Sequence, residues 1–312
     1  MADITQDIAP DDARARRNVG VLVAAQALMG AQMPIAFVLG GLAGQMLAEN
    51  KLYATLPISV IVVVSMFASP LLSQFMGRYG RRAGFILGAL AGIVAGVLCT
   101  WALVIGDFEL LVFGHAFIGI YMSAQAFYRF AAADTASDAF RPKAISWVMA
   151  GGLGAALLGP QMVILFGDAL APYTFAGGYV SIVALNVIGI AVLLLLDIPR
   201  PPRRAGPRDT GRPLMEIMRQ PQVVTAVICG MVSYALMNLM MTSTPLAVVG
   251  CGFTTDTAAD VVRWHVVAMF APSFFTGSLI ARYGVERIMA IGLAILLAAG
   301  VVALAGVDLF NF

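Results

Sequence analysis

The chain has 312 residues, of which 60% are apolar and only 12% are charged, and its mean hydropathy is +0.89. Soluble domains carry roughly 25% charged residues, so this composition excludes an ordinary soluble enzyme and predicts an integral membrane protein. The formal net charge of +2 is small and the arginines are not gathered with aromatic residues into a patch. Nucleic acid is therefore excluded as a partner.

Residues 1–18 form a polar N-terminal tail. Its acids, Asp3, Asp7, Asp11 and Asp12, precede its arginines, which is the reverse of the charge order in a signal peptide. We therefore expect the tail to be cytoplasmic and the apolar stretch that follows it to remain as the first membrane span.

Nine apolar segments follow along the chain. Each is close to the roughly 20 residues that an α-helix needs to cross the hydrocarbon core, and none alternates as membrane β-strands do. The expected spans are 19–46, 55–76, 84–105, 109–131, 144–166, 177–197, 222–248, 260–280 and 288–307.

The connections between these spans alternate in charge. Of the 19 Lys and Arg, all but Lys51 and Arg263 fall on one side when the spans are threaded through a bilayer. Basic residues collect on the cytoplasmic side, so the sequence predicts a protein of a bacterial cytoplasmic (inner) membrane with its N-terminus in the cytoplasm.

A basic, Pro-rich cytoplasmic linker, 198–221, divides the spans into two blocks. Six spans precede it in a transmembrane block at 19–197, and three follow in a partial C-terminal block at 222–312. Pro213 to Arg219 within the linker predicts a short helix on the membrane surface. Arg78-Tyr79-Gly80 recurs as Arg282-Tyr283-Gly284 after the second span of the second block. Unless this match is due to chance, it predicts a repeat architecture, apparently truncated after the ninth helix.

The blocks, the linker and the turn Gly77-Arg78-Tyr79-Gly80-Arg81-Arg82 resemble the major facilitator superfamily of secondary transporters. The resemblance implies an all-α membrane bundle with a six-helix N-terminal block and three helices of a second block. It also implies a permease that moves a small organic solute by alternating access. The sequence departs from the family motif at Ser73 and Gly77, which replace its first Gly and its Asp.

The turn and its copy form an expected cytoplasmic gating motif, in which arginines pair with acids at the end of the fourth span. The alternative is simple anchoring of the turns among lipid headgroups. The motif residues are Arg78, Gly80, Arg81, Arg82, Asp134, Asp138, Gly277, Arg282 and Gly284. Gly159 and Pro160 in the fifth span are a candidate hinge, and a Gly-Pro pair at this place resembles a feature of antiporters that favours efflux. The alternative is close helix packing by glycine.

Polar residues on one face of an apolar helix predict the lining of a substrate site. Two such stripes occur, one on the fourth span and one on the seventh, and comprise Tyr121, Gln125, Tyr128, Arg129, Tyr234, Asn238 and Thr242. Interhelical hydrogen bonding is the alternative for each residue. All 17 Asp and Glu lie in loops or at helix ends, so His265 and His115 are the candidates for coupling to a proton.

No arrangement of residues typical of catalysis or of a metal or cofactor site occurs. We therefore expect a transporter with no enzymatic activity and no cofactor, whose partners are a small-molecule substrate, membrane lipid and, as a candidate coupling ion, H+. Neither uptake nor efflux is favoured by the topology. The alternative function is a transporter-like scaffold or assembly factor that binds a pigment, lipid or protein without transport.

Overall fold

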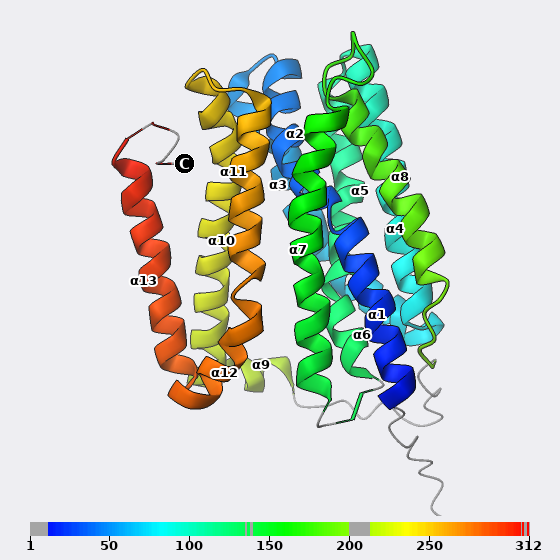
Figure 1. Cartoon of the computed structure of the whole chain (residues 1–312), viewed down its shortest axis with the longest axis vertical. Helices are drawn as coiled ribbons and strands as arrows, with labels where there is room; N and C mark the ends of the chain where they lie inside the picture. Colours follow the sequence, from blue (N-terminus) through cyan, green and yellow to red (C-terminus); the bar gives the residue numbers. More distant parts are fainter. Residues whose placement is uncertain are drawn as a thin grey trace, which may run out of the picture.

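The computed structural model describes residues 12–134, 136–137, 140–199 and 213–306, together with residues 308 and 311. Most of the N-terminal tail, Asp138 and most of the linker lie outside these residues. The described residues form helices joined by short connections and contain no strand (Figure 1). This confirms the predicted all-α fold.

The helices of the first block run from the N-terminus to Leu193. They are α1 (Asp12–Met29), α2 (Gln32–Leu47), α3 (Leu56–Tyr79), α4 (Arg81–Ile105), α5 (Phe108–Ala126), α6 (Tyr128–Asp134), α7 (Arg141–Phe166) and α8 (Ala176–Leu193), with a 3-10 turn at Lys51–Tyr53. The second block contains α9 (Leu214–Met218), α10 (Pro221–Gly250), α11 (Thr255–Phe270), α12 (Ser273–Tyr283) and α13 (Val285–Leu304). The short helix α9 lies where the linker predicted one.

Eight helical stretches of the described residues are long and apolar enough to cross a membrane. The expected eighth span, 260–280, is instead two helices, α11 and α12, each shorter than a bilayer-crossing helix. Pro272 lacks a backbone N–H and interrupts the helix there. Figure 1 shows α12 continuing from the lower end of α11, so that the two together run the height of the bundle.

The first span is interrupted at Gly30-Ala31, between α1 and α2. The backbone N–H of Gly30 still reaches the Gln26 carbonyl at 3.1 Å, and the Gln32 amide donates to the Met29 carbonyl at 3.1 Å. The Asn186 amide of α8 in turn donates to Oε1 of Gln32 at 3.1 Å. The backbone groups and side chains at the interruption thus find partners inside the block.

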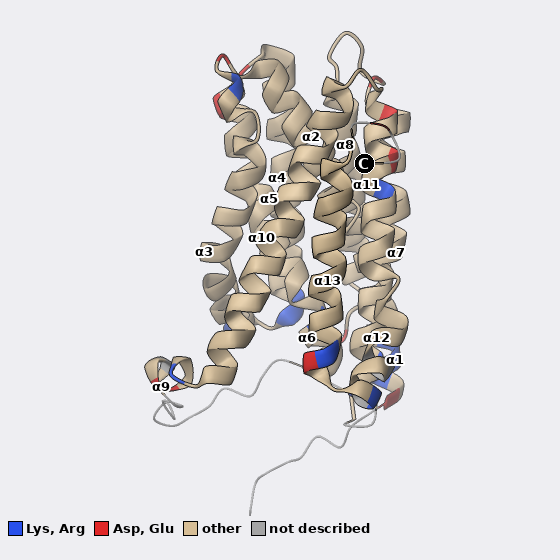
Figure 2. Cartoon of the chain, turned by 90° about the vertical axis from the view of Figure 1, so that its left-hand side faces the viewer, with Lys and Arg blue, Asp and Glu red and all other residues tan. Residues whose placement is uncertain are grey.

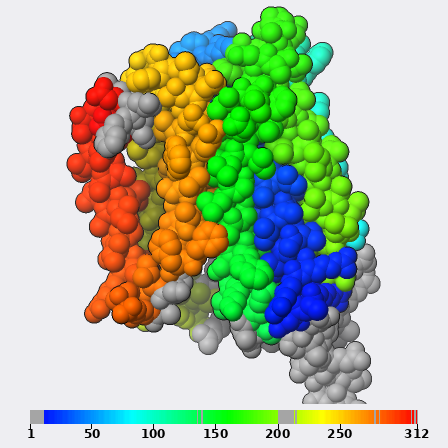
Figure 3. Space-filling view, in the orientation of Figure 1, coloured from blue at the N-terminus to red at the C-terminus, as the bar shows by residue number. Residues whose placement is uncertain are grey.

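The buried contacts between the two blocks lie toward one end. Buried residues of α10 are Met241, Pro245 and Val248, and those of α11 are Ala258, Ala259, Val262 and Val266. Four of them, Met241, Ala259, Val262 and Val266, join one hydrophobic cluster with residues of α2 and α7. Figure 3 shows α11, in orange, against α7, in green, in the upper half. The core at the other end contains first-block residues alone.

We call the end of the bundle that carries α9 and the turns at Gly80 and Gly284 the basic end. Charged residues gather near the two ends, and the long apolar middle carries few of them (Figure 2). The opposite end carries the connections at 48–55, 167–175 and 251–254, and it is the end where the two blocks meet.

The repeated turn has the same local structure in both copies. Gly80 has φ 92° and ψ 162°, Gly284 has φ 86° and ψ 156°, and each lies between two helices. The Arg78 guanidinium lies 5.5 Å from the Tyr79 ring centroid, and that of Arg282 lies 5.2 Å from Tyr283. The sequence repeat is therefore a structural repeat at this turn, and its positive φ explains the glycine.

Candidate functional site

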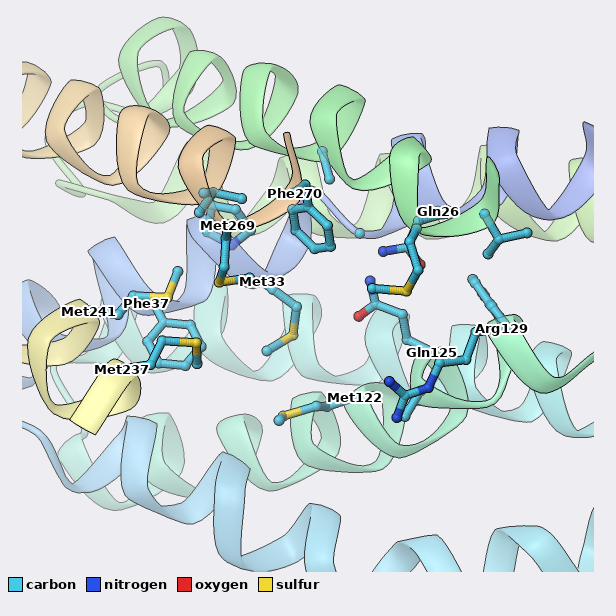
Figure 4. Close-up of a pocket in the computed structure, with 18 of the residues that line it drawn as sticks. Gln26, Met33, Phe37, Met122, Gln125, Arg129, Met237, Met241, Met269 and Phe270 are labelled. Atoms are coloured by element: carbon cyan, nitrogen blue, oxygen red, sulfur yellow. The ribbon is translucent and has the colours of Figure 1, made fainter. Parts of the chain in front are cut away.

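A cavity of about 410 Å³ lies between the two blocks (Figure 4). Its walls come from α1, α2, α5, α6 and α7 of the first block and from α10 and α11 of the second. This volume lies within the range of roughly 300–1,000 Å³ that is common for sites of small molecules. A cavity between two helical blocks is also the place where an alternating-access transporter holds its substrate.

Methionine is the most frequent residue in the cavity wall. The six are Met33, Met122, Met149, Met237, Met241 and Met269, and Phe37 and Phe270 lie among them. Methionine side chains are flexible and polarizable, and their sulfurs make favourable contacts with aromatic rings. The wall is therefore suited to a flat aromatic ligand. The polar-stripe criterion missed these residues, because methionine does not stand out in an apolar helix.

One end of the cavity is polar. Figure 4 shows Gln26, Gln125 and Arg129 together there, away from Phe37 and Met241. The Gln26 side chain belongs to a residue that is only 7% exposed. Among the described residues, neither glutamine amide has a hydrogen-bond partner, and the Arg129 guanidinium contacts the Phe130 ring at 5.0 Å. These polar groups are available to a ligand.

Two glycines make room for the two glutamines. A Cβ on Gly30 would lie 2.9 Å from Nε2 of Gln125, and a Cβ on Gly151 of α7 would lie 3.1 Å from Cβ of Gln26. Both separations are tighter than side chains normally allow. The absence of a side chain at Gly30 therefore leaves room for the end of the Gln125 side chain at the cavity.

Four of the seven residues in the two predicted stripes line this cavity, namely Gln125, Tyr128, Arg129 and Tyr234. Tyr121 is fully buried within the first block, where its hydroxyl makes no hydrogen bond to the described residues. Asn238 and Thr242 lie on α10 outside the lining, and their side-chain oxygens are buried without a partner in the described part of the chain.

The two histidines occupy different surroundings, and neither lines the cavity. Nδ1 of His115 lies 2.8 Å from the Leu111 carbonyl, and Nε2 lies 3.2 Å from the Tyr179 hydroxyl. This geometry fits a neutral ring that donates to Leu111 and accepts from Tyr179, enclosed in the first block. His265 on α11 has a buried Nε2 with no partner among the described residues.

The gating motif forms its ion pair within the first block. Nε of Arg81 lies 2.8 Å from Oδ2 of Asp134, joining α4 to α6. Gly277 lies in α12 and Arg282 follows it toward the Gly284 turn. The Arg81–Asp134 ion pair therefore lies within the first block and does not connect it to the second block.

A second ion pair at the basic end involves Arg14 and Asp197, whose closest atoms are 2.6 Å apart. The hydrogen bond from Arg14 lowers the pKa of Asp197, and the charges of Arg17 and Arg82 act in the same direction.

The candidate hinge residues lie inside one continuous helix, α7. A Cβ on Gly159 would lie 2.6 Å from the Ala31 carbonyl and 2.9 Å from Cβ of Pro34. Gly159 therefore permits the close approach of α7 to the interruption between α1 and α2, which is the packing role that glycine has in membrane helices.

Comparisons with known proteins agree with this architecture. The family model of the Major Facilitator Superfamily matches residues 50–311. The riboflavin transporter RfnT of Brucella anthropi is 42% identical over 97% of this chain and 76% of its own length. Two uncharacterized transporters of this type from Bacillus subtilis, YddS and YdeG, are 26% and 24% identical over 92% of the chain, covering 69% and 70% of their own lengths.

No solved structure matches the chain. The family match covers most of the chain, and the alignment with a transporter covers nearly all of it. The chain therefore belongs to the Major Facilitator Superfamily and is an integral membrane permease rather than an enzyme.

Proposed function

We propose that this permease transports riboflavin or a closely related flavin across the cytoplasmic membrane by alternating access. The observation that carries the proposal is the 42% identity to a riboflavin transporter over 97% of the chain. At this identity the two chains share a fold. The cavity between the blocks is therefore the candidate binding site for a substrate of the same kind.

The chemistry of the cavity supports a flavin. The isoalloxazine of riboflavin is a flat system of three fused rings with an apolar dimethylbenzene end and a polar pyrimidinedione end. Sulfur–aromatic contacts contribute roughly 0.3–1.5 kcal/mol each, and methionines surround the apolar part of the cavity together with Phe37 and Phe270. The cavity thus offers an aromatic ligand an apolar end and a polar end.

The packing of the blocks supports alternating access. The hydrophobic cluster that they share lies toward the opposite end, and the cluster at the basic end contains first-block residues alone. With the N-terminus and the basic end in the cytoplasm, as the distribution of arginines predicts, this conformation is open to the inside. The outward-open conformation then requires that the contacts of α10 and α11 with α2 and α7 separate.

We propose His265 as the residue that would bind and release a coupled proton. His115 has both ring nitrogens engaged by neighbours, whereas Nε2 of His265 is unpartnered on a helix that forms part of the cavity wall. We expect His265→Gln to remove the dependence of flux on a pH gradient, and His115→Gln to leave that dependence in place in whatever protein folds.

The test measures flux of radiolabelled riboflavin in proteoliposomes, in both directions, with Met237→Trp and Met231→Trp as a matched pair on α10. Met237 lines the cavity, whereas Met231 is 67% exposed on the outer surface of the same helix. We expect flux by the wild type and by Met231→Trp, and little flux by Met237→Trp. Saturable riboflavin binding without flux by the wild type would refute transport and support a scaffold.

A further inference from the structure

The polar end of the cavity has features that an apolar aromatic ligand would not need. Gln26 is more than nine-tenths buried, lines the cavity and has no hydrogen-bond partner among the described residues. The amide atoms of Gln26 are not among the fully buried polar atoms without a partner in the described part of the chain, so they are accessible from the cavity rather than enclosed in the packed interior. The amides of Gln26 and Gln125 and the guanidinium of Arg129 can therefore form hydrogen bonds with a ligand in the cavity.

The three groups come from neighbouring turns of the first block. Gln26 lies in the last turn of α1, and Gln125 and Arg129 lie four residues apart on either side of the junction between α5 and α6. Figure 4 shows the two amides directed toward each other and the guanidinium beside them, all at the same end of the cavity. Gly30 and Gly151 lie next to this arrangement, since a Cβ on Gly30 would lie 2.9 Å from Nε2 of Gln125 and a Cβ on Gly151 would lie 3.1 Å from Cβ of Gln26.

The hydrogen-bond donors and acceptors of these three side chains determine which groups a ligand must present to them. A glutamine amide offers both an acceptor and a donor, whereas a guanidinium only donates. A carboxylate or phosphate would suit Arg129 but would leave the two amide oxygens without donors. An edge that presents a carbonyl, an N–H and a second carbonyl in a row offers acceptors to the guanidinium and to the amide N–H groups, and it also offers a donor to one amide oxygen, which an anion cannot do. A cyclic imide has this edge.

We propose that Gln26, Gln125 and Arg129 recognise the imide edge of a pyrimidinedione ring, so that the N–H between its two carbonyls determines specificity. The inference rests on the proposed function, because the pyrimidinedione end of riboflavin carries this edge. The dimethylbenzene end then lies among Met237, Met241 and Phe37, at the far end of the cavity. A site built around a hydrogen-bonding group discriminates strongly against ligands that lack it.

The experiment compares riboflavin with N3-methylriboflavin, in which a methyl group replaces the imide proton. The full chain is purified in detergent, and binding of each flavin is titrated through the quenching of its fluorescence. We expect the wild type to bind riboflavin at least tenfold more tightly than the methylated compound. Equal binding of the two by the wild type would overturn the inference while leaving a flavin site intact.

Substitutions of the two glutamines test whether they cause the preference for riboflavin over N3-methylriboflavin. Gln26→Leu and Gln125→Leu are expected to weaken riboflavin binding about tenfold and to bring the ratio between the two flavins close to one. Gln74→Leu on the exposed surface of α3 is the matched control and should change neither value. Full preference in both cavity variants would also overturn the inference. If the wild type binds neither flavin, the proposed function fails together with it.

Discussion

Replacing Arg263 with Gln should make the end of the protein opposite the basic end open more often. Nη2 of Arg263 on α11 donates to Oε1 of Gln161 on α7 at 3.2 Å, which joins the two blocks. Nη1 of the same guanidinium lies 2.7 Å from Oδ1 of Asp260 on its own helix. The substitution therefore removes a charged donor between the blocks at the end where they are packed together.

The magnitude follows from the type of bond and its exposure. A hydrogen bond to a charged group contributes roughly 1.5–3 kcal/mol. The Arg263 side chain is 22% exposed and that of Asp260 is 50% exposed, so water screens part of the interaction and a value of about 1 kcal/mol is appropriate. That free energy corresponds to an increase of about fivefold in the population that is open at this end.

A cysteine at position 246 reports the opening. Leu246 of α10 is partly buried against α2, where a Cβ on Gly41 would be 3.4 Å from its Cγ, and it becomes more accessible when the blocks separate there. In a background with Cys229 and Cys251 replaced, Leu246→Cys is labelled from outside the membrane with an impermeant maleimide.

We expect Arg263→Gln to raise the labelling rate about fivefold. The control is Lys51→Gln, because Nζ of Lys51 bonds only the carbonyls of Gln45 and Ala48 within its own block. An unchanged rate in Arg263→Gln, or an equal increase in the Lys51 control, would refute the role of this contact in closure.

Three further outcomes follow from the described geometry. Gly80→Ala should destabilise the protein by roughly 1–3 kcal/mol, because a backbone with φ 92° and ψ 162° is accessible essentially to glycine alone. Thermal unfolding in detergent measures this loss of stability. The control is Gly20→Ala, whose added Cβ meets no atom within 4 Å and should cause no such loss. Gly152→Val should weaken riboflavin binding about tenfold, since its Cβ would lie 2.5 Å from the ring of Phe270 in the cavity wall; unchanged fluorescence quenching would contradict this. The lowered pKa of Asp197 means that its ion pair stabilises the fold above its ordinary pKa and that this stabilisation is lost as the pH falls below about 4; unfolding temperatures across pH should therefore fall less steeply in this acid range for Asp197→Asn than for the wild type.

Hydropathy was sufficient to predict the fold class, and the recurrence of Arg-Tyr-Gly predicted the structural repeat at Gly80 and Gly284. They could not locate the interruption at Gly30-Ala31, because the apolar composition continues across it and the polar side chain that completes it, Asn186, comes from a distant helix. The proline at position 272 itself indicated that a helix could be interrupted there. A window of about 20 residues averages over such a position.

The candidate site was partly predictable. The polar stripe on the fourth span includes Gln125, which lines the cavity, but it also includes Tyr121, which is buried in the interior of the first block. Which face of a helix borders a cavity depends on its neighbours and on the junction at Phe127, where α5 ends. Gln26 and the methionines such as Met33 lie outside any polar stripe, so only the packing of the two blocks identifies them.

The position of the cavity midway along the helices has a mechanical consequence. If the blocks rock as rigid bodies, the level of the bound ligand acts as the fulcrum and the helix ends as lever arms. A helix such as α3, with 24 residues, is about 36 Å long, so each arm extends about half that distance. A tilt that moves the side chains around the ligand by a fraction of an ångström is thereby multiplied into displacements of several ångströms at the two mouths.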